Sequence, residues 1–546
     1  MRLYHRTIFH NICLSTIFIV YLTLTGCTPP QVTQGVITIS ITADGKEIQT
    51  QVSAGSTVQE ALTEVEIALG ELDRVAPPLY TVLSDGSTVQ VIRVREEYYL
   101  EQVIVPYEHQ ELRNEALSIG QTILSQPGVN GLEEITYRRV YEDGVEISDS
   151  VVRRVILQEA IPEIVMVGSQ TPFASMPISG RIAYLSAGNA WLMEDTTGNR
   201  RPIVTTGDLD GQIFSLSPDG NWLLFTRSTP DDGSINSLWA ARIGSTQPSV
   251  VDIGVSNVVH FAAWDAGSTL VAYSTVEPRD IAPGWQANND LHVVGVSPSG
   301  FTSPPRLEVE ANSGVVYGWW GMDFAWASDS VRLAYARPDE VGMYDTRQDI
   351  FQPLMNISPL QTGGDWAWVP AISLAPDGDI IYTVNHVSTQ GTSNPEMSPR
   401  FDLLAIPLYG GAPVSLVANV GMFAYPVPSP EQTVVISQSI EGQPLSVEHA
   451  YQVAYLQAMQ PEQSEVSRYQ LYVMDRDGSN QRMIFPAEGA TGLDPQRVVW
   501  SPAPFNENGG YGVAVLYQGN IWLIDVISGL AQQITGDGLT ARIDWK

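Results

Sequence analysis

The chain has 546 residues, which is enough for two to four domains with separate hydrophobic cores. It carries 28 Lys and Arg against 60 Asp and Glu, so its formal net charge is −32, yet only 16% of its residues are charged and 44% are hydrophobic. This composition excludes a disordered acidic tail, and it disfavours nucleic acid as a partner because an acidic surface repels phosphate groups.

The first predicted element is an export signal. Arg2 and Arg6 precede an apolar run from Ile8 to Leu24, which is typical of a secretory signal peptide. A run of about 17 residues lies at the short end of a membrane span, so a plain transmembrane anchor is the alternative. Both interpretations place the rest of the chain outside the cytoplasm.

The signal ends in the tetrapeptide Leu24–Cys27, which resembles the bacterial lipobox. The resemblance implies that residues 1–26 are a lipoprotein signal peptide. Acyl chains on Cys27 would attach the protein to a bacterial membrane, with residues 27–35 as a lipidated tether. Cys13 is the only other cysteine, so no disulfide and no cysteine metal ligand is expected in the folded region.

Residues 36–94 have the pattern of a small β-grasp domain. Apolar and polar residues alternate over residues 36–41, and an Asp-Gly pair then marks a hairpin turn. A helix is predicted to follow Thr57, because Thr57 and Glu60 have the spacing of a capping box. The segment resembles the ubiquitin-like domain that precedes wall modules in resuscitation-promoting-factor-like and YabE-like proteins.

Residues 95–168 resemble the five-glycine (G-five) domain, an extended β module. The resemblance rests on five structural glycines in order along the segment, at Gly120, Gly128, Gly131, Gly144 and Gly168. Such a module needs glycine for positive φ and for close backbone approach. The resemblance implies a surface or wall protein, with roles in adhesion and in binding N-acetylglucosamine-type glycans.

Exposed aromatic rings in this segment are candidate sugar contacts, because an aromatic face packs against a sugar ring. The candidates are Tyr98, Tyr99, Tyr107, Tyr137 and Tyr141. The alternative is that these rings supply the small core of a thin module. His109 lies beside Glu108 and Glu111, but one histidine with two carboxylates favours a solvated surface over a zinc site. We predict neither a metal nor a cofactor.

Residues 169–179 are predicted to be a linker, and residues 180–546 contain a repeated unit of four apolar strands. A Pro-Asp-Gly-like turn follows the first strand of each unit. The residue before that turn is, in successive units, Leu216, Trp264, Trp326, Leu374, Pro428, Trp500 and Trp545. The units resemble the TolB-like propeller family, which implies seven blades, or six if the unit at Pro428 is an insertion.

The ring is expected to be closed by the end of the chain. The first unit, over residues 181–204, lacks an inner strand, whereas residues 540–545 form an inner strand without a blade. Pairing the two removes exposed sheet edges. The fold class is therefore mainly β, with a β-grasp domain, an extended five-glycine domain and a seven-bladed propeller.

Three long insertions mark one face of the propeller as the candidate binding face. They lie at residues 277–290, 385–401 and 438–469, each predicted between the second and third strands, the last with a possible helix near 447–459. Candidate ligand contacts near that face are Trp285, Trp319, Trp320, Trp366 and Trp368. The alternative is packing between blades, as expected for Trp264, Trp326 and Trp500.

Catalytic motifs are absent from the sequence. There is no metal-binding His-Glu-x-x-His, no Gly-x-Ser-x-Gly elbow and no P-loop, and the histidines after the signal are scattered. We therefore predict a non-enzymatic, lipid-anchored envelope protein that binds wall glycan through its small modules and a protein or glycan through its propeller. The alternatives are an assembly scaffold that binds only protein, and a hydrolase with an unrecognised carboxylate site in the propeller channel.

Overall fold

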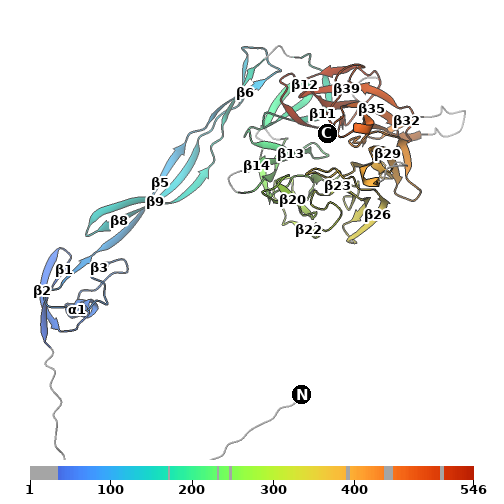
Figure 1. Cartoon of the computed structure of the whole chain (residues 1–546). Helices are drawn as coiled ribbons and strands as arrows, with labels where there is room; N and C mark the ends of the chain where they lie inside the picture. The colour runs from blue at the N-terminus through green and yellow to red at the C-terminus, as the bar shows by residue number, and fades with distance from the viewer. Residues whose placement is uncertain are drawn as a thin grey trace, which may run out of the picture. The chain divides into compact units, whose positions relative to one another are not determined.

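The computed structural model describes residues 35–169, 173–229, 233–244, 249–388, 394–435, 447–504 and 510–546. The predicted signal peptide and Cys27 lie outside the described residues. The chain divides into two compact units (Figure 1). Unit 1 contains the residues up to 108 together with 128–162, and unit 2 contains 109–127 together with 163–546. None of the helices in the described ranges has the length and apolarity that crossing a membrane requires.

The predicted β-grasp domain forms the start of unit 1. Its strands are β1 (Val36–Ala43), β2 (Lys46–Ser53), β3 (Arg74–Ala76) and β4 (Thr88–Ile92), in the order β2-β1-β4-β3 with β1 and β4 parallel. Helix α1 (Val58–Glu64) packs Val58 and Leu62 into the core. The helix starts as predicted, because the Thr57 amide donates to Glu60 Oε2 at 2.8 Å and Thr57 Oγ1 accepts from the Glu60 amide.

The five-glycine segment contains two separate three-stranded sheets. Strands β5 (Val94–Val105), β8 (Gly131–Glu142) and β9 (Val145–Gln158) form an antiparallel sheet in unit 1. Strands β6 (His109–Asn114), β7 (Thr122–Gln126) and β10 (Glu163–Gly168) form a second sheet, in the order β6-β10-β7, which belongs to unit 2. We call this second sheet the distal sheet.

The five glycines divide into two groups. Gly120 and Gly144 have φ of 86° and 83°, and Gly144 completes the Asp143-Gly144 turn between β8 and β9. A Cβ on Gly128, Gly131 or Gly168 would collide with neighbouring atoms, at Gly168 with the Ser118 carbonyl oxygen 2.0 Å away. Positive φ and close approach are therefore both present in this segment.

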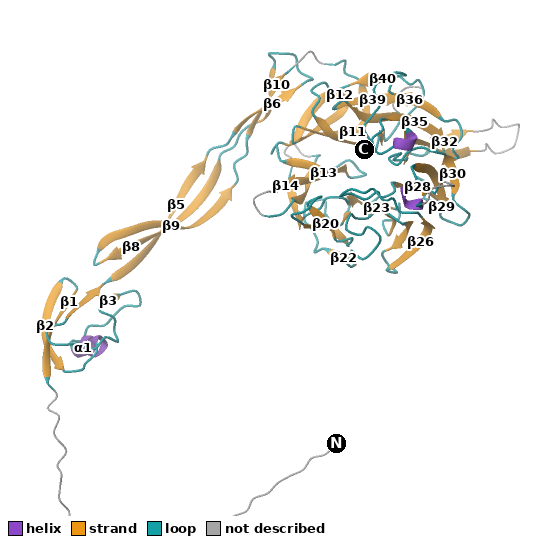
Figure 2. Ribbon diagram, in the orientation of Figure 1, coloured by secondary structure: helices purple, strands orange, loops and turns teal. Residues whose placement is uncertain are grey.

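Within the described residues, seven sheets of unit 2 are arranged in a ring (Figures 1 and 2). The first three sheets are formed by β41 (Thr540–Trp545), β11 (Pro177–Ser186) and β12 (Asn189–Val204); by β13 (Leu209–Leu216), β14 (Trp222–Ser228), β15 (Asn236–Arg242) and β16 (Val250–Ser256); and by β17 (Ala262–Trp264), β18 (Leu270–Tyr273), β21 (Leu291–Gly295) and β22 (Arg306–Val309). The fourth and fifth are formed by β23 (Asp323–Trp326), β24 (Arg332–Arg337), β25 (Glu340–Asp345) and β26 (Ile350–Asn356); and by β27 (Ile372–Leu374), β28 (Ile380–Val387), β29 (Arg400–Pro407) and β30 (Val414–Val417). The last two are formed by β31 (Val427–Pro428), β34 (Gln452–Ala458), β35 (Tyr469–Asp475) and β36 (Arg482–Phe485); and by β37 (Val499–Trp500), β38 (Gly512–Tyr517), β39 (Asn520–Asp525) and β40 (Ala531–Gln533). The predicted count of seven blades is confirmed.

The C-terminal strand completes the first blade, as predicted. Strand β41 pairs antiparallel with β11. The Trp545 side chain is 1% exposed and its indole N–H donates to the Ser179 carbonyl at 2.7 Å. Trp500 makes the same kind of bond to the carbonyl of Val427 in the neighbouring blade, at 2.8 Å. The Trp500 bond therefore ties two adjacent blades together, whereas the Trp545 bond lies within the first blade.

Two of the three insertions lie where the sequence placed them. Residues 277–290 connect β18 to β21 and include the hairpin of β19 (Val276–Pro278) and β20 (Trp285–Ala287). Residues 385–401 connect β28 to β29 and include a short 3-10 helix, η2 (Pro395–Met397). Both are second-to-third connections of their sheets.

The third insertion was wrongly predicted. The hairpin of β32 (Gln432–Val435) and β33 (Val447–Ala450) lies between β31 and β34, so it connects the first and second strands. The possible helix near 447–459 is instead two strands, β33 and β34, followed by the 3-10 helix η3 (Pro461–Gln463). Strand β34 is buried on both faces between β31 and β35, and a short apolar run of that kind has no period that separates strand from helix.

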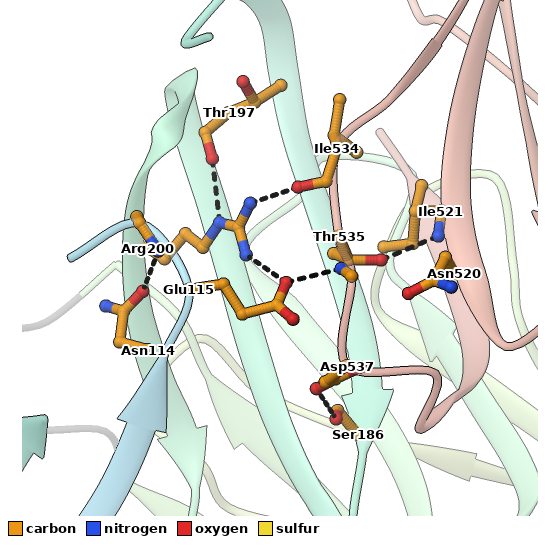
Figure 3. Close-up of polar contacts among 12 residues, drawn as sticks. Asn114, Glu115, Ser186, Thr197, Arg200, Asn520, Ile521, Ile534, Thr535 and Asp537 are labelled. Carbon is orange, nitrogen blue, oxygen red and sulfur yellow. Dashed lines mark hydrogen bonds and ion pairs between the residues drawn. The ribbon is translucent and has the colours of Figure 1, made fainter. Parts of the chain in front are cut away.

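The distal sheet is joined to the first and last blades by a buried ion pair (Figure 3). The side chains of Glu115 and Arg200 are 7% and 4% exposed, and Arg200 Nη1 lies 3.5 Å from Glu115 Oε2. Glu115 Oε2 also accepts the Gly536 amide at 2.7 Å, and Arg200 Nε donates to the Thr197 carbonyl at 2.9 Å. Arg200 Nη2 donates to the Ile534 carbonyl. We call this group the junction.

Candidate functional site

The candidate site is a pocket of about 420 Å³ on the propeller, lined by residues from three successive blades. The β19–β20 hairpin supplies residues 279–286, the connection before β23 supplies Trp319, and the connection before β27 supplies Gly364 and Asp365. The Ala287 amide donates to the Trp319 carbonyl at 2.9 Å, which ties the hairpin to the next blade. We call this cavity the tryptophan pocket.

Aromatic contacts hold the ring of Trp285 in place. Its centroid lies 5.1 Å from that of Trp320 and 6.0 Å from that of His260, whose ring is inclined to it by only 15°. Trp320 in turn meets Trp319 edge to face at 5.8 Å. Offset and edge-to-face contacts of this kind stabilise aromatic clusters beyond simple burial. The two tryptophans that line the pocket therefore belong to one connected cluster.

His260 packs against Trp285 and is not among the binding residues predicted from the sequence. Both of its ring nitrogens are inaccessible to solvent and have no hydrogen-bond partner among the described residues. Burial lowers the pKa of His260 to about 4, and the negative charge of Asp290 opposes that shift without cancelling it. The ring is therefore neutral at pH 7. A lone histidine before a strand gives no sequence signal that its ring will pack against Trp285.

Some of the polar side chains that line the pocket are already hydrogen-bonded within the protein, and others are not. Arg279 Nη2 donates to Glu277 Oε2 at 2.6 Å and to Gln286 Oε1 at 3.1 Å, so its charge is already compensated. Asp365 is exposed, and neither its carboxylate nor the amide nitrogen of Gln286 has a partner within the described residues. The pocket therefore offers a free acceptor and a free donor beside its rings.

The five predicted tryptophans separate into three positions. Trp285 and Trp319 line the pocket, and Trp320 packs behind Trp285. Trp366 is half-buried against Phe423, 6.3 Å away, and does not line the pocket.

Trp368 is a correction to the expected binding set. It is 2% exposed, and its indole N–H donates to the Met422 carbonyl at 3.0 Å. Trp366 and Trp368 both precede β27 and lie outside any strand, so the alternation of strand residues does not relate their orientations. Trp368 is a core residue that packs between blades and presents no ring face to a ligand.

In unit 1, three of the predicted tyrosines share one face of the β5-β8-β9 sheet. Tyr99 is directly opposite Tyr137 in the register, and their rings are stacked at 5.0 Å with an interplanar angle of 7°. The Arg139 guanidinium lies 4.6 Å above the Tyr99 ring. The Tyr99 hydroxyl donates to Asp149 at 2.8 Å. Tyr141 lies under the Arg95 guanidinium on the same face.

The remaining two tyrosines lie elsewhere. Tyr98 is 61% exposed and points to the opposite face of the sheet, because neighbouring strand residues alternate. The Tyr107 ring packs where a Cβ on Gly128 would be, 2.3 Å from the nearest ring carbon. The structure therefore brings together Tyr99, Tyr137 and Tyr141, but neither of the others.

His109 forms an exposed ion-pair network with carboxylates. Its Nδ1 lies 2.5 Å from Glu163 Oε1 and its Nε2 lies 3.7 Å from Glu111 Oε1. The hydrogen bond with Glu163 raises the pKa of His109. No group of three or more candidate metal ligands occurs in the part of the chain that the structure describes.

The propeller channel is a cavity of about 1090 Å³, and the hydrolase alternative requires carboxylates in it or beside it. Asp544 in the channel wall accepts the Leu216 amide at 2.7 Å. Asp323 is ion-paired with Arg497 at 2.6 Å, and burial raises the pKa of Asp323. Each of these carboxylates is thus bound to a group of the protein itself.

Comparison with known proteins supports the assignment of the N-terminal modules. Residues 96–170 match the G5 domain family, and residues 39–79 match the G5-linked ubiquitin-like domain family. Both resemblances drawn from the sequence are thereby confirmed.

Two curated relatives are similar to part of the chain. Resuscitation-promoting factor RpfB of Mycolicibacterium smegmatis is 25% identical over 161 residues, covering 29% of this chain and 44% of that protein. Resuscitation-promoting factor Rpf2 of Corynebacterium glutamicum is 29% identical over 161 residues, covering 30% of this chain and 42% of that protein. The chain thus spans less than half the length of these relatives. The domain matches and these relatives favour an extracellular or cell-wall location.

Solved structures similar to the propeller include the periplasmic gluconolactonase PpgL of Pseudomonas aeruginosa. The TM-score is 0.39 at 13% sequence identity, and the match covers 67% of this chain and 98% of that one.

Proposed function

We propose that the chain is a non-enzymatic, lipid-anchored binding protein of the bacterial cell envelope. Its N-terminal modules contact wall glycan of the N-acetylglucosamine type, and its propeller holds a protein or glycan partner at the tryptophan pocket. The lipobox-like tetrapeptide ending in Cys27 and the G5 and ubiquitin-like matches support the location. The observation that carries the proposal is the convergence of Trp285 and Trp319, from two different blades, on one cavity.

The chemistry of the tryptophan pocket is that of a binding site. Ligand pockets combine a mostly apolar lining with a few oriented polar groups, which fix the ligand's orientation. Here the rings of Trp285 and Trp319 supply the apolar area, while Gln286 and Asp365 supply the donor and the acceptor. The second candidate is an envelope assembly scaffold that binds only protein.

The wall-binding half is tested by co-sedimentation with purified peptidoglycan. The protein would start at residue 27 and carry Cys27→Ser, so that lipid does not contribute to pelleting. We expect the protein to pellet with the wall. Tyr137→Ala should reduce retention about tenfold, because it removes a stacked ring from the Tyr99 face.

The matched control is Tyr80→Ala in the β-grasp domain, where the tyrosine is 82% exposed. Retention of this variant should equal that of the parent. If the parent protein stays in the supernatant, the proposal that the N-terminal modules bind wall glycan is wrong, and the scaffold alternative is then favoured. If Tyr137→Ala and Tyr80→Ala are retained equally, the stacked face is not the contact.

A further inference from the structure

The tryptophan pocket has features that select among classes of ligand. The inference about ligand class rests on the proposed function only in placing a partner at this pocket. The first feature is rigidity. Trp285 is backed by Trp320 and His260, and the hairpin that carries it is fixed by the hydrogen bond between Ala287 and Trp319. A ring held in place before binding loses little conformational entropy when a flat, apolar ligand face packs on it.

The second feature is the balance of charge. Arg279 is already neutralised by Glu277, so the pocket has no free cation to attract a carboxylate or a phosphate. The free polar groups are the Asp365 carboxylate and the Gln286 amide nitrogen. A vicinal pair of hydroxyls can donate to the former and accept from the latter, and neutral sugars carry such pairs.

The third feature is the backbone around the pocket. A peptide that binds by strand addition needs an open strand edge with free amides and carbonyls. One edge of β20 pairs with β19, and on its other edge the Ala287 amide is already bonded to the Trp319 carbonyl. That edge therefore does not offer the free amides and carbonyls that strand addition needs. The observed lining is more compatible with a ligand that uses side-chain and ring contacts.

The fourth feature is a small apolar patch beside the rings. Ile281, Ala282 and Pro283 line the pocket within the same hairpin that carries Trp285. Their side chains lack donors and acceptors, and a methyl group attached to a sugar ring would be buried there without loss of hydrogen bonds. A plain hexose has no such methyl, whereas an N-acetylated hexosamine does.

We infer that the tryptophan pocket is a saccharide site that takes an N-acetylated hexosamine. The pyranose ring packs on Trp285 and Trp319, a hydroxyl pair bonds Asp365 and Gln286, and the acetamido methyl contacts the Ile281–Pro283 patch. A volume of about 420 Å³ accommodates a short oligosaccharide.

The test uses the protein with Cys27→Ser and Tyr137→Ala, so that the glycan contact proposed on the Tyr99 face of unit 1 does not contribute. The two soluble probes are the trimer of N-acetylglucosamine and the trimer of glucose. Binding is followed by tryptophan fluorescence and by isothermal titration. We expect the acetylated trimer to bind and the glucose trimer to bind at least about tenfold more weakly. Trp285→Ala and Trp319→Ala should each weaken binding of the acetylated trimer about tenfold or more, and Asp365→Asn should weaken it several-fold.

Trp239→Ala, at a half-buried tryptophan of β15 in another blade, is the matched control and should bind as the parent does. Binding that persists in both pocket variants would place the saccharide elsewhere and overturn the inference. Equal binding of the two trimers would overturn the assignment of the acetamido contact.

A third probe, a hexaproline peptide, separates this inference from the proposed function. If hexaproline binds in a Trp285-dependent way and neither trimer does, the saccharide class is wrong while a partner at the pocket remains. If the acetylated trimer binds at the pocket but the protein does not pellet with peptidoglycan, the inference stands and the wall-binding proposal fails.

Discussion

At the scale of single residues, the ring of Trp285 packs against a histidine that has no hydrogen-bond partner among the described residues. His260 contributes its flat face to Trp285, while both of its nitrogens are buried without partners. An unpartnered buried polar atom costs about 1–3 kcal/mol, because it lost its water and gained nothing in exchange. A cost of this size at one position is consistent with a residue kept for the orientation of its neighbour.

The first prediction concerns His260→Phe, which keeps the ring and removes both nitrogens. At pH 7.5 we expect the variant to be more stable than the parent by about 1 kcal/mol in urea unfolding. The control His260→Ala removes the ring, so it should lower both the free energy of unfolding and the affinity of the tryptophan pocket for the trimer of N-acetylglucosamine. A less stable Phe variant would show that the nitrogens are satisfied in solution.

The same residue gives a pH dependence with a definite sign. The folded pKa of about 4 lies below the unfolded value of 6.5, so on acidification the unfolded chain takes up the proton first. His260 should therefore make the protein less stable as pH falls from 6.5 to 4, by as much as about 3 kcal/mol. The stability difference between His260→Phe and the parent should widen over this range, and a constant difference would contradict the assigned burial.

At the scale of elements, the junction joins the distal sheet to the propeller. Removing one partner of a buried ion pair leaves an uncompensated charge in a poorly solvated site, which typically costs about 3–5 kcal/mol. Arg200 keeps its bonds to the Thr197 and Ile534 carbonyls when Glu115 is removed, so its charge stays buried. The junction is therefore a point where one substitution has a large effect.

We predict that Glu115→Ala lowers the free energy of unfolding of unit 2 by about 3 kcal/mol, measured by urea denaturation. Glu115→Gln should cost less, because an amide oxygen still accepts the Gly536 amide and because burial raises the pKa of Glu115, which shows that its charged form is disfavoured there. The double variant Glu115→Leu, Arg200→Met should recover most of the loss. If Glu115→Ala unfolds like the parent, the ion pair is not formed.

The elements that sequence reasoning identified are those with local signals. The turn between β1 and β2 and the start of α1 follow from neighbours within four residues, and both are present. The apolar run of β34 shows neither the helical period of 3.6 residues nor the strand period of 2, so the sequence does not distinguish a helix from a strand there. The pairing of β34 with β31 and β35 makes it a strand. The ion pair of Glu115 and Arg200 joins residues 85 apart and has no local signal at all.

At the scale of the whole molecule, the ring depends on its last strand. Strand β41 pairs with β11, and Trp545 is packed in the core formed with Ile182, Tyr184 and Trp191. Without β41 the inner edge of β11 would be an open strand with unpaired amides and carbonyls, which promotes aggregation.

We predict that Trp545→Ala lowers the free energy of unfolding by about 3–5 kcal/mol, because it leaves a large cavity in that core. Deleting residues 540–546 should abolish the folded monomer in size-exclusion chromatography. Leu539→Ala, at a side chain that is 56% exposed just before the strand, is the control and should change stability by no more than about 0.5 kcal/mol. A deleted chain that elutes as a stable monomer would show that closure is dispensable.

The blade count and the closing strand were predictable because a similar turn recurs along the chain and the aligned residue is tryptophan in four of the seven units. The binding face was predictable only in outline. Trp366 and Trp368 lie in the connection before β27, where no strand periodicity shows which side chain is buried, and so the sequence could not distinguish the core residue from the half-buried one. The position of His260 behind Trp285 depends on two connections folding together.

The division of the five-glycine segment between two units also affects how the protein responds to cleavage. The chain passes from one unit to the other at three places, after residues 108, 127 and 162. A protease that cuts one of these passages leaves two polypeptides, and in every case at least one pair of hydrogen-bonded strands has one strand in each polypeptide. The β5–β8 and β6–β10 ladders then keep the pieces together. Separation of the propeller from the N-terminal modules by nicking in this segment would require unfolding as well as hydrolysis.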